Sequence, residues 1–105
     1  MLATDLTRDA ILSDLRRLQP QLRARGVSGL AIFGSRARGD HRPESDLDVL
    51  VDVVPGRKFS LLDLIGVSHL ISDALGVHAN PVMRRSLDSR TRAAIERDLI
   101  EIFHE

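Results

Sequence analysis

A Gly-Ser pair followed at a fixed distance by two aspartates constrains this chain more than any other feature of its sequence. Gly34 and Ser35 end the apolar stretch 30–33, and ten residues separate them from Asp46-Leu47-Asp48. A second apolar run follows at once, which predicts a strand. Because side chains alternate between the faces of a strand, we expect Asp46 and Asp48 to point to the same side.

Two carboxylates on one face indicate a site for a hard cation. They repel each other when no cation lies between them. Mg²⁺ takes oxygen ligands, usually one or two carboxylates, and completes its shell with substrate phosphates and water. Asp46 and Asp48 therefore predict a Mg²⁺ site. For the pair alone, a second interpretation stays open, namely two surface acids at a solvated strand end.

The upstream turn strengthens the first interpretation. Gly34 allows the backbone to turn sharply and to approach a ligand closely. Ser35 is expected to cap the helix that follows, and its hydroxyl and N–H suit a phosphate. Arg36 and Arg38 add positive charge near the same point. Turn and carboxylates together predict a site for a nucleoside triphosphate with Mg²⁺, whereas Ser35 alone is equally explained as a helix cap.

Length and composition narrow the class of protein. The chain has 105 residues, which predicts a single domain over 1–105, and its formal net charge is zero. We therefore expect no direct nucleic-acid binding. Charged residues near the start argue against a signal peptide, and no apolar run approaches the roughly 18 residues of a membrane span. A cytoplasmic protein without a membrane partner is expected.

The order of apolar and breaker residues predicts an α/β domain in which strands and helices alternate. Short strands are expected over 30–33, 46–53 and 77–83, a helix at Ser35, a loop over 40–45, and a turn from Gly26 to Gly29. Longer helices are expected over 3–25 with a kink or boundary at Pro20, and from Ser60 to Leu75. A last helix is expected to start near Asp88 or Ser89 and to bury Ile95, Leu99 and Ile102.

Two of these helices carry detailed expectations. Ile11, Leu15, Leu18 and Leu22 share one stripe of the first. Ser60 and Asp63 have the spacing of a capping box at the start of the second, and Gly76 is suited to its C-cap. The buried face of this second helix is expected to contain Leu61, Leu64, Ile65, Ile71 and Leu75.

The spacing Gly34-Ser35-x10-Asp46-x-Asp48 resembles the signature of the polymerase-beta-type nucleotidyltransferases. The residue pattern Gly-Ser-Arg-Ala-Arg-Gly…Ser-Asp-Leu-Asp-Val-Leu-Val resembles that of the minimal nucleotidyltransferases in particular. These are small stand-alone bacterial or archaeal proteins, often paired with HEPN-domain proteins in toxin–antitoxin systems. The resemblance covers nearly the whole chain and is strongest over residues 30–53. It implies a polymerase-beta-like fold, with a small mixed β-sheet packed against helices.

The resemblance also implies roles. Gly34 and Ser35, with Arg36 beside them, would bind the nucleotide, and Asp46 and Asp48 would bind Mg²⁺ and be the catalytic residues. The implied reaction is Mg²⁺-dependent transfer of a nucleoside monophosphate, AMP from ATP, to a hydroxyl on a partner such as a HEPN toxin. The chain would then be an antitoxin enzyme.

One position departs from the family pattern. A third carboxylate normally lies on a later strand, and the matching residue here is Asn80. Asn offers a carbonyl oxygen to a cation, but it carries no charge and accepts no proton. Residues 75–87 contain no acid, and Asp52 would lie about 13 Å along the strand from Asp48. We expect Asp52 to pair with an arginine, and His78 to be a surface residue or a surrogate base.

Asn80 keeps a second function open. The chain could be a catalytically weakened or inactive antitoxin that neutralises its partner by binding. A nucleotide-sensing regulatory domain is a third interpretation, and the apolar helix faces would also allow a homo-oligomer.

Overall fold

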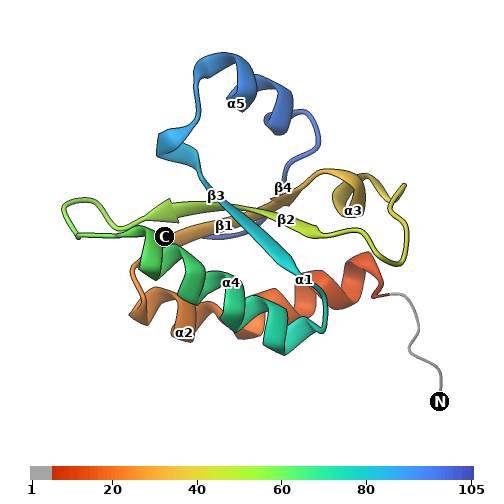
Figure 1. The fold of residues 1–105 in the computed structure, drawn as a ribbon, viewed down its shortest axis with the longest axis horizontal. Helices are drawn as coiled ribbons and strands as arrows, with labels where there is room; N and C mark the ends of the chain where they lie inside the picture. Colours follow the sequence, from red (N-terminus) through yellow and green to blue (C-terminus); the bar gives the residue numbers. More distant parts are fainter. Residues whose placement is uncertain (1–5) are drawn as a thin grey trace.

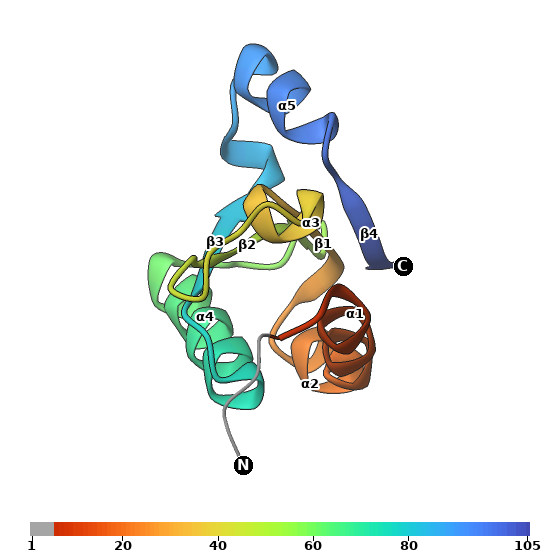
Figure 2. The same ribbon diagram turned by 90° about the vertical axis from the view of Figure 1, so that its right-hand side faces the viewer.

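The computed structural model describes residues 6–105 and shows one sheet with helices on both sides (Figure 1). In the turned view, α1, α2 and α4 lie below the sheet, α3 lies above it, and α5 stands apart at the top (Figure 2). The elements in chain order are α1 Arg8–Arg17, α2 Gln19–Ala24, β1 Val27–Phe33, α3 Ser35–Arg38, β2 Leu47–Val53, α4 Leu61–Leu75, β3 Ala79–Met83, the 3₁₀ turn η1 Arg84–Ser86, α5 Ser89–Glu96 and β4 Ile100–His104.

The sheet is mixed, as expected from the resemblance. Its strand order is β3-β2-β1-β4. β1 pairs antiparallel with β2 and with β4, whereas β2 and β3 run parallel. The two central strands therefore hold the sheet together, and β3 and β4 are its edges. The predicted fold class is confirmed.

Apolar side chains of the central strands meet the helices below them in one core. Alternate residues of β2, Leu47, Val49 and Val51, are almost fully buried. They belong to the same cluster as the α1 stripe residues Ile11 and Leu15. Because side chains alternate along a strand, this packing turns Asp48 toward the opposite face. The core thus decides which face of the sheet carries the carboxylate.

The first helix differs from the prediction over 3–25. Residues 3–5 lie outside the described residues, and the remainder forms α1 and α2, with Leu18 as the boundary residue between them. Pro20 stands in the first turn of α2, where its missing N–H leaves no helix bond broken. The boundary expected at Pro20 is confirmed, and the predicted stripe is buried except for Leu18, which is partly buried.

Helix α4 begins as predicted but buries a different face. Asp63 accepts from the Ser60 N–H at 2.7 Å, and this bond holds the pKa of the Asp63 carboxyl below its usual value. Val67 and Ile71 are buried, whereas Leu61 is 70% and Ile65 41% exposed. The expected burial of Leu61 and Ile65 is wrong because the helix is rotated so that their flank lies outside the core.

No helix within residues 6–105 is long and apolar enough to cross a membrane.

The expected last helix is wrong beyond Glu96. Residues 100–104 form β4, which pairs with the free edge of β1. Ile102 is buried as expected, but as a residue of the edge strand that lies beside β1 and contacts α1, not as part of a helix. A short apolar run is compatible with both helical and strand periodicity. The unpaired backbone edge of β1 favours the strand, because residues 100–104 can hydrogen-bond to it.

The strand limits also shift. β1 starts at Val27 rather than 30, so the stretch expected to be a turn already belongs to the sheet, with an irregularity between Val27 and Gly29. Gly29 faces Asp52, whose carboxylate oxygen would lie 2.9 Å from a Cβ at this position. A glycine inside a strand often marks such a close approach. β2 starts one residue late, at Leu47, and β3 two residues late, at Ala79.

Two serines of α4 close the outer edge of β3. Ser72 accepts from the Ala79 N–H at 2.9 Å, and Ser68 donates to the Ala79 carbonyl at 2.7 Å. Pro81, two residues on, faces the same edge and has no N–H to leave unpaired. The edge strand is therefore protected by a helix and a proline, and its position relative to β2 is fixed.

We expect Ser72→Ala to lower the free energy of unfolding by about 1–3 kcal/mol, because it leaves the buried Ala79 N–H without a partner. Urea denaturation followed by circular dichroism measures this loss. Ser89→Ala on α5 is the matched control, since within residues 6–105 its hydroxyl makes no hydrogen bond. Equal stability of the two variants would contradict the assigned edge contact.

Candidate functional site

The turn after β1 lies directly against a carboxylate of β2. Gly34 has φ 77° and ψ −158°, a combination that is essentially restricted to glycine. A Cβ built at Gly34 would lie 2.5 Å from Oδ2 of Asp48. The antiparallel register places Phe33 opposite Asp48, so the backbone of the next residue passes over its side chain. The turn and the carboxylate, which the sequence placed in one site, are in contact.

Ser35 is the first residue of α3, not its cap. The N-cap position is held by Gly34, and no side chain among the described residues caps the helix with a hydrogen bond. The prediction that Ser35 caps α3 is wrong, because the turn at Gly34 already brings the chain into the helix. Within residues 6–105 the Ser35 hydroxyl has no hydrogen-bond partner, so it is not committed to the helix end.

Arg36 is buried, which sequence reasoning missed. Its side chain is 2% exposed, with Nε 3.0 Å from the Ser45 carbonyl and Nη2 3.2 Å from the Pro43 carbonyl. The guanidinium therefore holds the loop that leads into Asp46. Its Nη1 is buried without a partner among the described residues. A contact between Arg36 and a nucleotide stays a prediction.

Arg38 ties the end of α3 to the segment before β4. Its guanidinium donates to Asp40 and to Asp98, each at 3.0 Å. The hydrogen bond from Arg38 holds the pKa of the Asp40 carboxyl below its usual value, and the same two bonds raise the pKa of Arg38. Both groups are exposed, so this contact contributes orientation more than stability.

The aspartates lie at the start of β2, beside Asn80 on β3. Asp46 immediately precedes the strand, and Asp48 is its second residue. The parallel register pairs Asp48 with Asn80, and the Asn80 amide donates to Oδ1 of Asp48 at 3.2 Å. Asn80 is thus the residue of β3 next to the carboxylate pair, as the sequence match required.

The neighbouring titratable groups are an exposed histidine and a partly buried ion pair. His78 Nδ1 lies 3.5 Å from Oδ1 of Asp46, and both side chains are exposed. Asp52 forms an ion pair with Arg84 at 2.9 Å. The expected pairing of Asp52 with an arginine is confirmed, which leaves Asp46 and Asp48 as the acids of the site.

The oxygen ligands available here fit a Mg²⁺ ion whose coordination shell is completed by a substrate. Asp46 and Asp48 would supply carboxylate oxygens, and rotation of the Asn80 amide would bring its carbonyl oxygen beside the Asp48 carboxylate in place of the nitrogen. Within residues 6–105 no group of three or more His, Cys, Asp and Glu residues gathers as a metal cage. Mg²⁺ commonly binds through one or two carboxylates plus phosphates. The residues present therefore suit an ion that arrives with a phosphate ligand.

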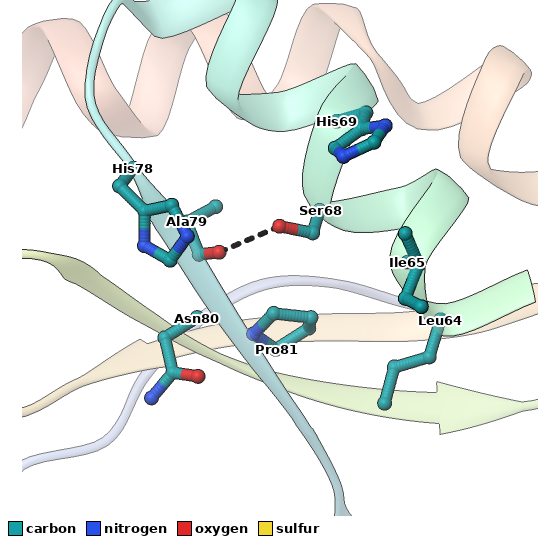
Figure 3. A pocket seen from close by; sticks show the side chains of 8 residues that line it. All are labelled: Leu64, Ile65, Ser68, His69, His78, Ala79, Asn80 and Pro81. Carbon is teal, nitrogen blue, oxygen red and sulfur yellow. Dashed lines mark hydrogen bonds between the residues drawn. The ribbon is translucent and has the colours of Figure 1, made fainter. Parts of the chain in front are cut away.

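A pocket of about 310 Å³ opens between α4 and β3, beside Asn80 (Figure 3). Its walls combine aliphatic and polar side chains, and the Ser68 hydroxyl bonds to the Ala79 carbonyl at its back. The lining residues are Leu64, Ile65, Ser68, His69, His78, Ala79, Asn80 and Pro81. No local pattern in the sequence indicates this pocket, because its walls form only when α4 and β3 lie side by side.

Gly34→Ala is expected to destabilise the protein more than Gly76→Ala. Both glycines have positive φ, but a Cβ at Gly34 meets Asp48 and a Cβ at Gly76 meets nothing within 4 Å. The control should lose about 1–2 kcal/mol from its left-handed backbone alone. Thermal unfolding of the two variants gives the difference. Equal losses would show that the turn does not press on Asp48.

Comparison with protein families matches residues 9–104 to the model described as nucleotidyltransferase domain. Among curated relatives, the protein adenylyltransferase MntA of Thermococcus cleftensis is 34% identical over 100 residues, 92% of this chain and 97% of the relative. A candidate protein adenylyltransferase of Methanocaldococcus jannaschii is 38% identical over 77 residues, 72% of this chain and 76% of the relative.

Solved structures give the same fold. A candidate minimal nucleotidyltransferase is 34% identical with a TM-score of 0.66, over 85% of this chain and 93% of the other. A toxin–antitoxin crystal structure with AMP-PNP is 16% identical with a TM-score of 0.71, over 88% of this chain and 73% of the other. A complex of tri-AMPylated HEPN toxin from Shewanella oneidensis with MNT antitoxin has a TM-score of 0.66 at 13% identity, covering 90% and 73%.

Proposed function

The chain belongs to the nucleotidyltransferase domain family, and we propose that it acts as a protein adenylyltransferase of a toxin–antitoxin pair. It would transfer AMP from ATP, with Mg²⁺, to a hydroxyl on a partner protein such as a HEPN toxin. The contact between the Gly34 turn and the Asp48 carboxylate carries this proposal. This contact supports the proposal because a turn suited to a phosphate and a carboxylate suited to a cation lie against each other.

Each element of the site has a task in this transfer. Backbone N–H groups of the Gly34-Ser35 turn would hold the triphosphate. Arg36 fixes the loop before Asp46, so that both aspartates keep their place. Mg²⁺ bound at Asp46 and Asp48 would supply positive charge for the attacking and leaving oxygens. The buried Arg36 and the register of β2 thus serve to position the carboxylates before substrate arrives.

The transfer itself is a substitution at phosphorus. The acceptor oxygen forms a bond to the α-phosphorus, and the bond from that phosphorus to the bridging oxygen breaks. Pyrophosphate leaves with the electron pair, and the hydroxyl proton passes to solvent. Asn80 accepts no proton, so this chain lacks the base that an acid at its position would supply.

The partner class rests on the relatives and on the resemblance. The MntA relative is named a protein adenylyltransferase, and this chain covers nearly all of it. Two complexes that share the fold are toxin–antitoxin pairs, one with AMP-PNP and one with an AMPylated HEPN toxin. A HEPN-type partner and an antitoxin role are therefore proposed for this chain, and its oligomeric state and cytoplasmic location remain predictions.

Asp46→Ala is expected to abolish transfer, because it removes one of the two carboxylates that would hold the cation. The chain and a HEPN-type protein offered as acceptor are incubated with Mg²⁺ and ATP labelled at the α-phosphate, and label on protein is counted. Asp73→Ala, an exposed acid on the far part of α4, is the control and should label normally. Full transfer by Asp46→Ala would contradict the assignment of Asp46 as a cation ligand.

A second candidate, neutralisation by binding alone, is favoured by the amide at Asn80. Its hydrogen bond to Asp48 leaves the site with two negative charges and without the third acid. Such a site could retain the nucleotide and the partner while transferring slowly. Under this candidate, Asp46→Ala would leave neutralisation of the toxin intact.

Asn80→Asp separates the two candidates. Restoring an acid beside Asp48 adds a cation ligand and a proton acceptor, so transfer should rise on the order of 10²-fold. Titration calorimetry should also show tighter Mg²⁺ binding. Asn80→Ala, which removes the amide without adding charge, should give no rise. Absence of label in both the native chain and Asn80→Asp, with a stable partner complex, would establish the binding role.

A further inference from the structure

The two oxygens of Asp48 face different elements of the site. Oδ2 lies against Gly34 at the end of β1, and Oδ1 accepts from Asn80 on β3. β2, which carries Asp48, lies between these two strands in the sheet. The phosphate-binding turn and Asn80 therefore flank the carboxylate from opposite sides.

This arrangement assigns the direction from which an acceptor must arrive. In phosphoryl substitution the attacking and leaving oxygens lie roughly in line through the phosphorus. Pyrophosphate held at Gly34 and Ser35 would leave on the β1 side of Asp48. The attacking hydroxyl must then come from the opposite side, over Asn80 and β3.

The β3 side carries the pocket and an exposed apolar face. The pocket reaches Asn80 at one end and Ile65 of α4 at the other (Figure 3). Leu61 and Leu62, which are 70% and 78% exposed, continue the apolar surface from Ile65 toward the start of the helix. At 3.6 residues per turn these three side chains occupy one flank of α4. Large aliphatic side chains gathered on one exposed flank mark a contact surface.

We propose that this flank of α4 and the pocket beside it bind the acceptor protein and present its hydroxyl over Asn80. The occupant is a polypeptide segment with a large aliphatic or aromatic side chain close to the hydroxyl-bearing residue. That side chain fills the pocket, and the flanking segment packs on Leu61, Leu62 and Ile65. The inference rests on the proposed transfer to a protein, and it adds where that protein sits.

The chemistry of the pocket fits a side chain of a protein. At about 310 Å³ its volume is at the lower end of the roughly 300–1,000 Å³ of small-molecule sites. Leu64, Ile65 and Pro81 supply apolar wall, and the apolar surface continues well outside the cavity. A nucleobase would use the cavity alone, whereas a docked protein also covers the exposed leucines. Interfaces commonly have such an apolar anchor pocket surrounded by a less buried rim.

The test uses single substitutions on the two flanks of α4. Leu62→Glu and Ile65→Glu place a charge on the proposed surface, and both positions are exposed, so the fold should persist. Ala74→Glu is the matched control, since nine residues after Ile65 it lies on the other flank. Circular dichroism and thermal unfolding check that all three variants fold.

Three quantities are measured for each variant: affinity for the HEPN-type protein that serves as acceptor, label transferred to that protein, and affinity for AMP-PNP with Mg²⁺. Leu62→Glu and Ile65→Glu should weaken partner binding and labelling by about tenfold or more, the effect of losing a central interface residue. AMP-PNP affinity should stay unchanged, and Ala74→Glu should match the native chain in all three.

The other possible outcomes distinguish the docking surface from the proposed transfer. Partner binding and labelling equal to those of Ala74→Glu would overturn the inference and leave the proposed function standing. Loss of AMP-PNP affinity in Ile65→Glu would assign the pocket to the nucleotide and overturn it as well. If the native chain binds its partner without labelling it, the proposed transfer fails. The surface is then upheld where Ile65→Glu weakens that complex, and overturned where it does not.

Discussion

The antiparallel pairing of β1 with β2 is the constraint on which the site depends. Its register sets Phe33 opposite Asp48, so that the turn at Gly34 lies on the carboxylate. A slip of one residue would move Asp48 to the helix-covered face and Val49 to the site. The buried side chains of β2 prevent such a slip, because they would leave the core. Packing energy therefore maintains the contact between the Gly34 turn and the Asp48 carboxylate.

Charge at the site is lower than the family pattern implies, and this has a structural consequence. A third acid at position 80 would repel Asp48 in the absence of a cation. The Asn80 amide instead donates a hydrogen bond to Asp48, which joins β2 and β3 through their side chains as well as their backbones. The same replacement removes a proton acceptor. One substitution therefore exchanges a charge repulsion for a hydrogen bond between neighbouring strands.

Helix α4 has two roles that meet at β3. Through Ser68 and Ser72 it satisfies the outer backbone groups of Ala79, which keeps the edge strand and hence Asn80 in place. The rotation that brings these serines to the strand also turns Leu61 and Ile65 outward, and Ile65 lines the pocket that reaches Asn80. Protection of a sheet edge and an exposed apolar flank thus follow from one helix orientation.

Local signals in the sequence determined the parts of the protein that depend on neighbouring residues. The capping box at Ser60, the turn at Gly34 and the spacing to Asp46 and Asp48 each act within a few residues or one strand pair. Tertiary structure decided what depends on distant partners. Residues 100–104 form a strand because they pair with the free edge of β1. Arg36 is buried because it donates hydrogen bonds to two carbonyls of the following loop. An apolar or charged residue alone does not reveal which surface will cover it, since that surface is supplied by a segment far along the chain.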